Sequence, residues 1–175
     1  MSAWDTEQAL IAQERSWMYD RDDALGGARV YGATEADMSA VERMPLSPAA
    51  IRAARDLQHS AAQRAALREM EAGRLGEAAV MYLEMAQHVY EEAGEPEVMP
   101  ERVVTLRRAW SDLTLRSYQQ LGGRYVTIYR GECCTTCRRA RAGKIRIADE
   151  LAAPTLPHAD CAEGICACDY SPVVG

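Results

Sequence analysis

All six cysteines of this chain lie between residues 133 and 168, and none occurs in the 132 residues before them. Such a cluster can form disulfide bonds, a redox centre or a metal site, and each of these ties separate parts of the segment together. In a reducing compartment, clustered cysteines more often bind a metal or carry out redox chemistry than form structural disulfides. The cluster therefore predicts a distinct C-terminal module organised by its thiols.

The remaining composition is that of a globular protein. At 175 residues and 48% hydrophobic, the chain is long enough for one ordinary core and a small appendage. Its N-terminus has no basic region followed by an apolar run, and no later stretch approaches the roughly 18 to 20 apolar residues of a membrane span. We expect a soluble, cytoplasmic protein without a membrane segment.

The first 123 residues predict helices separated by glycine and proline. Residues 5–20 are expected to form a first helix, while glycines and a proline interrupt residues 20–47. We expect an irregular arm there, with at most one short helix near residues 35–43. Three domains follow from this pattern: an N-terminal helix and arm over 1–47, an antiparallel helical unit over 48–123, and a cysteine-rich module over 124–175.

The helical unit is predicted from three amphipathic stretches. Ser47 and Pro48 supply an N-cap and a first residue for a helix that runs to about residue 72. A second helix ends at Gly94, and a third begins behind Pro100. The third carries an apolar stripe with Trp110 and other residues at spacings of three and four, which we expect to lie in the core: Val103, Leu106, Trp110 and Leu113.

Small residues in the second helix suggest close helix packing. Gly73, Glu77, Ala78, Tyr82 and Ala86 resemble the turn and second helix of a tetratricopeptide hairpin. The resemblance covers about one repeat and implies an antiparallel helix pair in the middle of the chain.

After Gly123 the pattern becomes that of strands. Residues 125–129 and 143–149 both alternate, and they flank Cys134 and Cys137. The simplest arrangement is a β-hairpin with this Cys-x-x-Cys at its tip. The predicted fold class is therefore mainly α: a bundle of three or four helices followed by a small β-hairpin module like a zinc ribbon.

The spacing of the cysteines predicts a zinc (Zn²⁺) site. Two residues between thiolates allow both sulfurs to bind one ion, and the segment returns with further donors after 23 residues. Cys133 is expected to point away from that ion. There are more donors than the four positions of a structural site, so the ligands are expected to be four of five cysteines, with His158 as an alternative: Cys134, Cys137, Cys161, Cys166 and Cys168.

Basic residues surround the predicted site. Residues 124–146 carry seven basic side chains and one acidic side chain, in a chain of net charge −6. Guanidinium groups near a cage of thiolates stabilise its negative charge, and we assign that role to the four basic residues that follow the Cys-x-x-Cys: Arg138, Arg139, Arg141 and Lys144. The alternative is a nucleic-acid surface, although no aromatic residue suitable for stacking bases lies between Arg130 and Arg146.

The pattern of the last 45 or so residues resembles a cysteine-rich tail of uncharacterised bacterial proteins. It is also similar to the terminal metal-binding segment of phage head-morphogenesis proteins, although the compact His-Pro-x-Cys-x-Cys ending is absent. The resemblance implies metal binding and, for a phage protein, a place in the virion. It is carried by Cys134, Cys137, Gly143, Lys144, Glu150, Pro154, Leu156, Pro157, Cys161, Cys166, Cys168 and Tyr170.

These patterns favour a non-catalytic protein. Zinc hydrolases keep an open coordination position and a nearby base, whereas ligands are in excess here, and His59 and His88 stand alone on predicted helices. We expect a zinc-stabilised interaction or assembly protein that binds a protein partner through its helical surface. The alternatives are a zinc ribbon that binds nucleic acid and a thiol redox sensor that uses Cys134 and Cys137.

Overall fold

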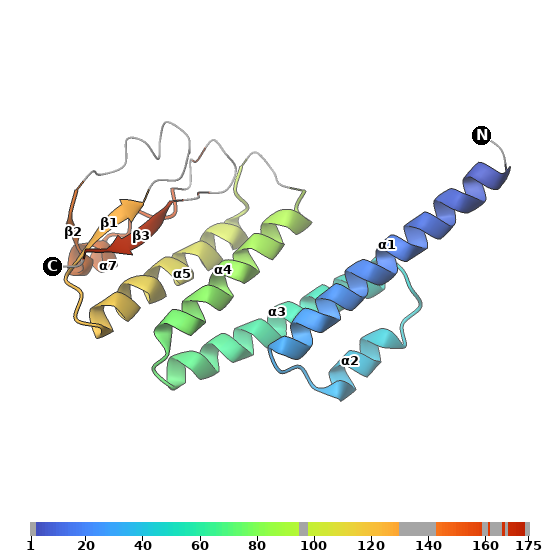
Figure 1. The fold of residues 1–175 in the computed structure, drawn as a ribbon, viewed down its shortest axis with the longest axis horizontal. Coiled ribbons are helices and arrows are strands. Elements are labelled where there is room, and N and C mark those ends of the chain that lie inside the picture. The colour runs from blue at the N-terminus through green and yellow to red at the C-terminus, as the bar shows by residue number, and fades with distance from the viewer. Residues whose placement is uncertain are drawn as a thin grey trace. The chain divides into compact units, whose positions relative to one another are not determined.

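The computed structural model describes most of the chain, in six stretches: residues 3–94, 98–129, 143–158, 161, 166 and 168–173. It is mainly helical, and five helices precede a small three-stranded antiparallel sheet (Figure 1). The chain divides into two compact units, Met1–Ala65 and Ala66–Gly175. None of the helices in the described part is both long and apolar enough to cross a membrane.

The first unit contains α1 (Ala3–Val30), α2 (Glu35–Glu42) and the beginning of α3 (Pro48–Glu71). The prediction of an irregular arm from residue 20 was wrong in its first part, because α1 continues for ten residues beyond that point. The short helix predicted near residues 35–43 is confirmed as α2. Its N-terminus is fixed by a capping box, in which Thr34 and Asp37 satisfy each other's backbone N–H groups.

Packing explains why α1 passes through two consecutive glycines. A Cβ atom added at Gly27 would lie 2.2 Å from Nε2 of Gln58 on α3, so the missing side chain gives Gln58 its place. The neighbouring residues of α1, Ala24, Leu25 and Ala28, are buried. Burial of this face offsets the helix propensity of about 1 kcal/mol that each glycine loses relative to alanine.

The second unit begins with an antiparallel helix pair, α4 (Leu75–Glu92) and α5 (Glu101–Gln120), which lie side by side in Figure 1. These helices and their boundaries were predicted. Trp110 and Leu113 are buried against small residues of α4, as the apolar stripe of the sequence had indicated.

The sheet follows α5 in the order β2-β1-β3. The central strand β1 (Tyr125–Tyr129) pairs antiparallel with β2 (Ile145–Arg146), which confirms the predicted hairpin. A third strand, β3 (Asp169–Pro172), pairs with the other edge of β1 and was not predicted. Between β2 and β3, α7 (Ile147–Ala152) forms where the sequence had suggested a helical turn.

One face of the sheet forms the main core of this unit. Val126 and Ile128 of β1 are buried, while Tyr125 and Tyr129 alternate with them and are exposed. The buried face joins a cluster that includes Leu115 of α5 and the three cysteines that the structure describes. The cysteine segment is thus continuous with the hydrophobic core rather than attached to its surface.

A tight turn connects α5 to the sheet. Gly122 has a φ of +84°, and the N–H groups of Gly122 and Gly123 donate to the carbonyls of Gln119 and Tyr118 at 3.0 and 2.9 Å. This is the Schellman pattern of helix termination. A Cβ atom added at Gly123 would lie 2.8 Å from the carbonyl oxygen of Tyr118, so this position has no room for a side chain.

We therefore expect Gly123→Ala to lower the free energy of unfolding by roughly 1 to 3 kcal/mol, because backbone must move to admit the methyl group. Gly76→Ala is the matched control, since a Cβ atom there meets only Oγ of Ser117, at the ordinary contact distance of 3.5 Å. Chemical denaturation of both variants measures the difference. Equal stability of the two would show that the turn relaxes without cost.

Candidate metal centre

The described cysteines lie between α7 and β3. Cys161, Cys166 and Cys168 are all buried, with exposed fractions of 5%, 0% and 0%, and no disulfide bond joins them to one another. The predicted ligands Cys134 and Cys137 lie outside the described residues, as do Cys133, Arg138, Arg139 and Arg141. Lys144 is exposed next to β2.

The register of the sheet brings the two halves of the cysteine segment to one end. Tyr129, the last residue of β1, pairs with Asp169, the first residue of β3. In an antiparallel pair, the chain leaves one strand where it enters the other. The chain therefore departs toward Cys134 at the same end of the sheet at which Cys168 enters β3.

A buried arginine holds the backbone of the second half. The Arg107 side chain on α5 is 6% exposed, and its Nη2 donates to the carbonyl of Cys166 and, at 3.4 Å, to the carbonyl of Cys168. The guanidinium carbon lies 4.2 Å from the centre of the Trp110 ring, a cation–π distance. Arg107 thus connects helix α5 to two candidate ligands that are about 60 residues later in the chain.

The charge of Arg107 matches an anionic site. Burial lowers the pKa of Arg107, while negative charge at Cys166, Asp169 and Cys168 acts in the opposite direction. Burial raises the pKa of Asp169, against a hydrogen bond of 2.6 Å from the Tyr170 N–H and the charge of Arg107. A guanidinium in this place compensates part of the negative charge that several thiolates around one divalent ion would carry.

A second buried network holds the turn that precedes the cysteines. The Tyr170 hydroxyl donates to Oε2 of Glu150 at 2.8 Å and accepts from the N–H of Leu156 at 3.2 Å. Both the N–H and the hydroxyl of Thr155 also donate to Glu150. Burial, and then the bond to Glu150, raise the pKa of Tyr170, so its hydroxyl keeps the proton it donates. The network fixes β3, α7 and the turn after α7 to one another.

His158 lies at the end of that turn. Its carbonyl accepts a hydrogen bond from the N–H of Cys161 at 3.3 Å, and its Nε2 is a buried atom without a hydrogen-bond partner in the described part of the structure. A buried imidazole nitrogen without a partner suits a metal ligand. Within the described ranges, however, no three His, Cys, Asp or Glu side chains are grouped closely enough to hold a metal ion.

Sequence reasoning missed the roles of Arg107 and Glu150. For Arg107 a signal was present, because it lies on the apolar stripe of α5, four residues after Val103 and three before Trp110. A charged residue on a buried helix face requires a polar partner elsewhere in the fold. For Glu150 no such signal exists, since a carboxylate in the first turn of a short helix is ordinary.

The chain was compared with protein-family models, with curated proteins and with solved structures, and nothing in these three comparisons matches it. The resemblances to a tetratricopeptide hairpin and to a phage or bacterial cysteine-rich tail stay predictions.

The position of Arg107 gives a direct test of this part of the site. Arg107→Met keeps an apolar stem but leaves the carbonyls of Cys166 and Cys168 without their donor, and we expect it to lower the free energy of unfolding by about 1 to 3 kcal/mol. Arg116→Met is the control on the same helix, because Arg116 is exposed and bonds only to Asp112. It should change stability by less than about 1 kcal/mol. Similar losses in both variants would contradict the role assigned to Arg107.

Proposed function

We propose that this chain is a non-catalytic protein whose C-terminal unit is stabilised by one zinc ion and whose helical surface binds a protein partner. The observation that carries the zinc site is the burial of three cysteines at the end of the sheet from which the chain departs toward Cys134 and Cys137. These two residues would supply two ligands. Two more would come from Cys161, Cys166 and Cys168, with His158 as the alternative.

Chain length supports this ligand set. Cys134 comes five residues after Tyr129, and Cys137 comes six residues before Gly143. Five or six residues span at most about 22 Å when fully extended, so the Cys-x-x-Cys is tethered near the end of the sheet from both sides. Bound zinc would cross-link the two halves of the segment and add its binding energy to folding.

The surroundings of the described cysteines favour a structural role over a redox or hydrolytic one. Redox-active thiols need access to an oxidant or a substrate, whereas these three side chains are at most 5% exposed. A hydrolytic zinc site keeps one position open for water, and a site enclosed in the core, with donors in excess, favours four protein ligands.

The partner surface is proposed on the first turns of α1. Leu10, Ile11 and Met18 are 56%, 36% and 47% exposed. Residues seven and eight positions apart lie on one side of a helix, so these three side chains form a single apolar stripe. An exposed apolar stripe on a helix is a common docking surface for another protein.

We expect protein purified without chelator to contain about one zinc per chain by elemental analysis. Cys134→Ser and Cys137→Ser should each lose the metal and loosen the C-terminal unit, while helical circular dichroism largely persists. Cys133→Ser is the control and should keep the zinc. Stoichiometric disulfides with no metal in the wild-type protein would refute the proposed site.

For the partner, we expect immobilised wild-type chain to retain one protein in stoichiometric amount, and the double change Ile11→Glu with Met18→Glu to abolish this. Val80→Glu changes an exposed apolar residue on α4 and should have no effect. Duplex DNA should bind only weakly, with a dissociation constant on the order of 10⁻⁴ to 10⁻⁶ M at physiological salt. Nanomolar, sequence-dependent binding of DNA would favour the nucleic-acid alternative instead.

A further inference from the structure

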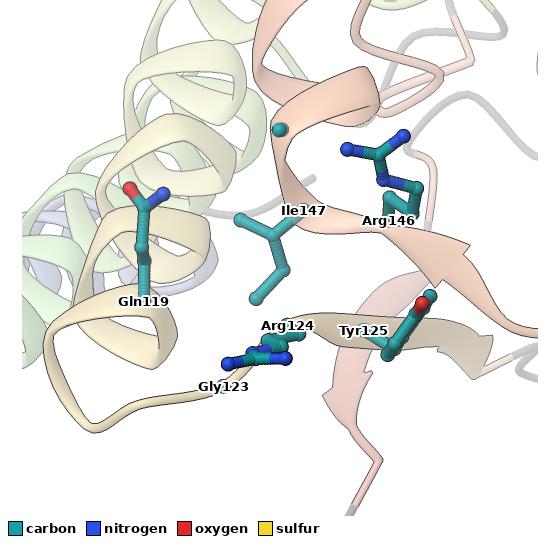
Figure 2. A pocket seen from close by; sticks show the side chains of 7 residues that line it. Gln119, Gly123, Arg124, Tyr125, Arg146 and Ile147 are labelled. Carbon is teal, nitrogen blue, oxygen red and sulfur yellow. The ribbon is translucent and has the colours of Figure 1, made fainter.

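A pocket separate from the cysteines lies where α5, β1, β2 and α7 meet. It has a volume of about 370 Å³ and is lined by Gln119, Gly123, Arg124, Tyr125, Arg146, Ile147 and Ala148. In the view of Figure 2, Gln119 lies on one side of Ile147, with Tyr125 and Arg146 on the other. The volume falls within the range of small-molecule sites.

The backbone fixes both arginines at this pocket. Arg124 directly precedes β1, and its carbonyl accepts a hydrogen bond from the N–H of Ile147 at 3.0 Å. Arg146 is paired with Tyr125 in the β1–β2 ladder. The Cα atoms that carry the two guanidinium groups are therefore held in place before any ligand arrives, which lowers the entropic cost of binding.

Neither guanidinium is neutralised within the described part of the chain. The side chains of Arg124 and Arg146 form no ion pair or hydrogen bond with a described residue. Two cations that line one pocket repel each other, and an anion placed between them removes that repulsion. Guanidinium groups bind carboxylate and phosphate oxygens with paired hydrogen bonds.

The other side chains of the pocket suit a small organic anion. Gln119 offers an amide and Tyr125 a half-exposed ring and hydroxyl, while the buried Ile147 provides an apolar wall. From this arrangement we propose that the pocket binds a small molecule bearing a phosphate or multiple carboxylate groups, with Arg124 and Arg146 as its anion ligands. This site goes beyond the zinc-stabilised adaptor function and does not depend on it.

Calorimetric titration of the full chain with sodium pyrophosphate, and separately with citrate, tests the proposal and distinguishes the two sources of anionic oxygen. We expect saturable binding of one anion per chain for at least one of them. Arg124→Gln and Arg146→Gln should each weaken it by about tenfold or more, because each removes a charge-assisted pair of hydrogen bonds. Both side chains are exposed, so these variants should keep the thermal midpoint of the wild type.

Arg108→Gln is the matched control, because it removes the same charge from an exposed position on α5 outside the pocket. It should leave the affinity within about twofold of the wild type, because its guanidinium does not reach the ligand and salt screens distant charges. Since the chain carries a net charge of −6, its overall field does not favour anions. The absence of saturable binding of both anions, or an equal loss in Arg108→Gln, would overturn the proposal.

Discussion

The C-terminal unit depends on a buried guanidinium. A cation removed from water is costly unless its charge and its N–H groups are satisfied, and Arg107 meets this requirement through the carbonyls of Cys166 and Cys168 and the face of Trp110. Helix α5 therefore fixes the chain just before β3. Because β3 is in turn held in register with β1, one side chain coordinates the helix pair, the sheet and the candidate metal ligands.

Where local chemistry decides the structure, the sequence was sufficient. Ser47 begins α3 through its hydroxyl, which accepts from the N–H of Ala50, and Gly73 ends the helix with a positive φ. The alternation of β1 was equally clear. Long-range packing decided the rest. The glycines in α1 suggested a break, yet Gly27 is needed for the approach of Gln58. The four residues of β3, with an aspartate and a proline, have weak strand propensity and depend on β1 for their conformation.

The candidate site shows the same division. Residue types and spacing were enough to predict zinc donors, because ligand chemistry is written in the cysteines themselves. The groups that position those donors belong to other elements, and their roles depend on burial. Arg107 and Glu150 resemble ordinary surface residues until the fold places them at 6% and 3% exposure.

The central place of β1 has a consequence for the order in which this unit assembles. Its partner β2 follows after a short connection, whereas β3 follows only after α7 and the whole cysteine segment. Shorter loops cost less entropy to close, so the topology favours a hairpin that forms early and a third strand that docks late. The thiols therefore stay open to oxidants for most of the folding reaction, and reducing conditions protect the nascent protein more than the finished one.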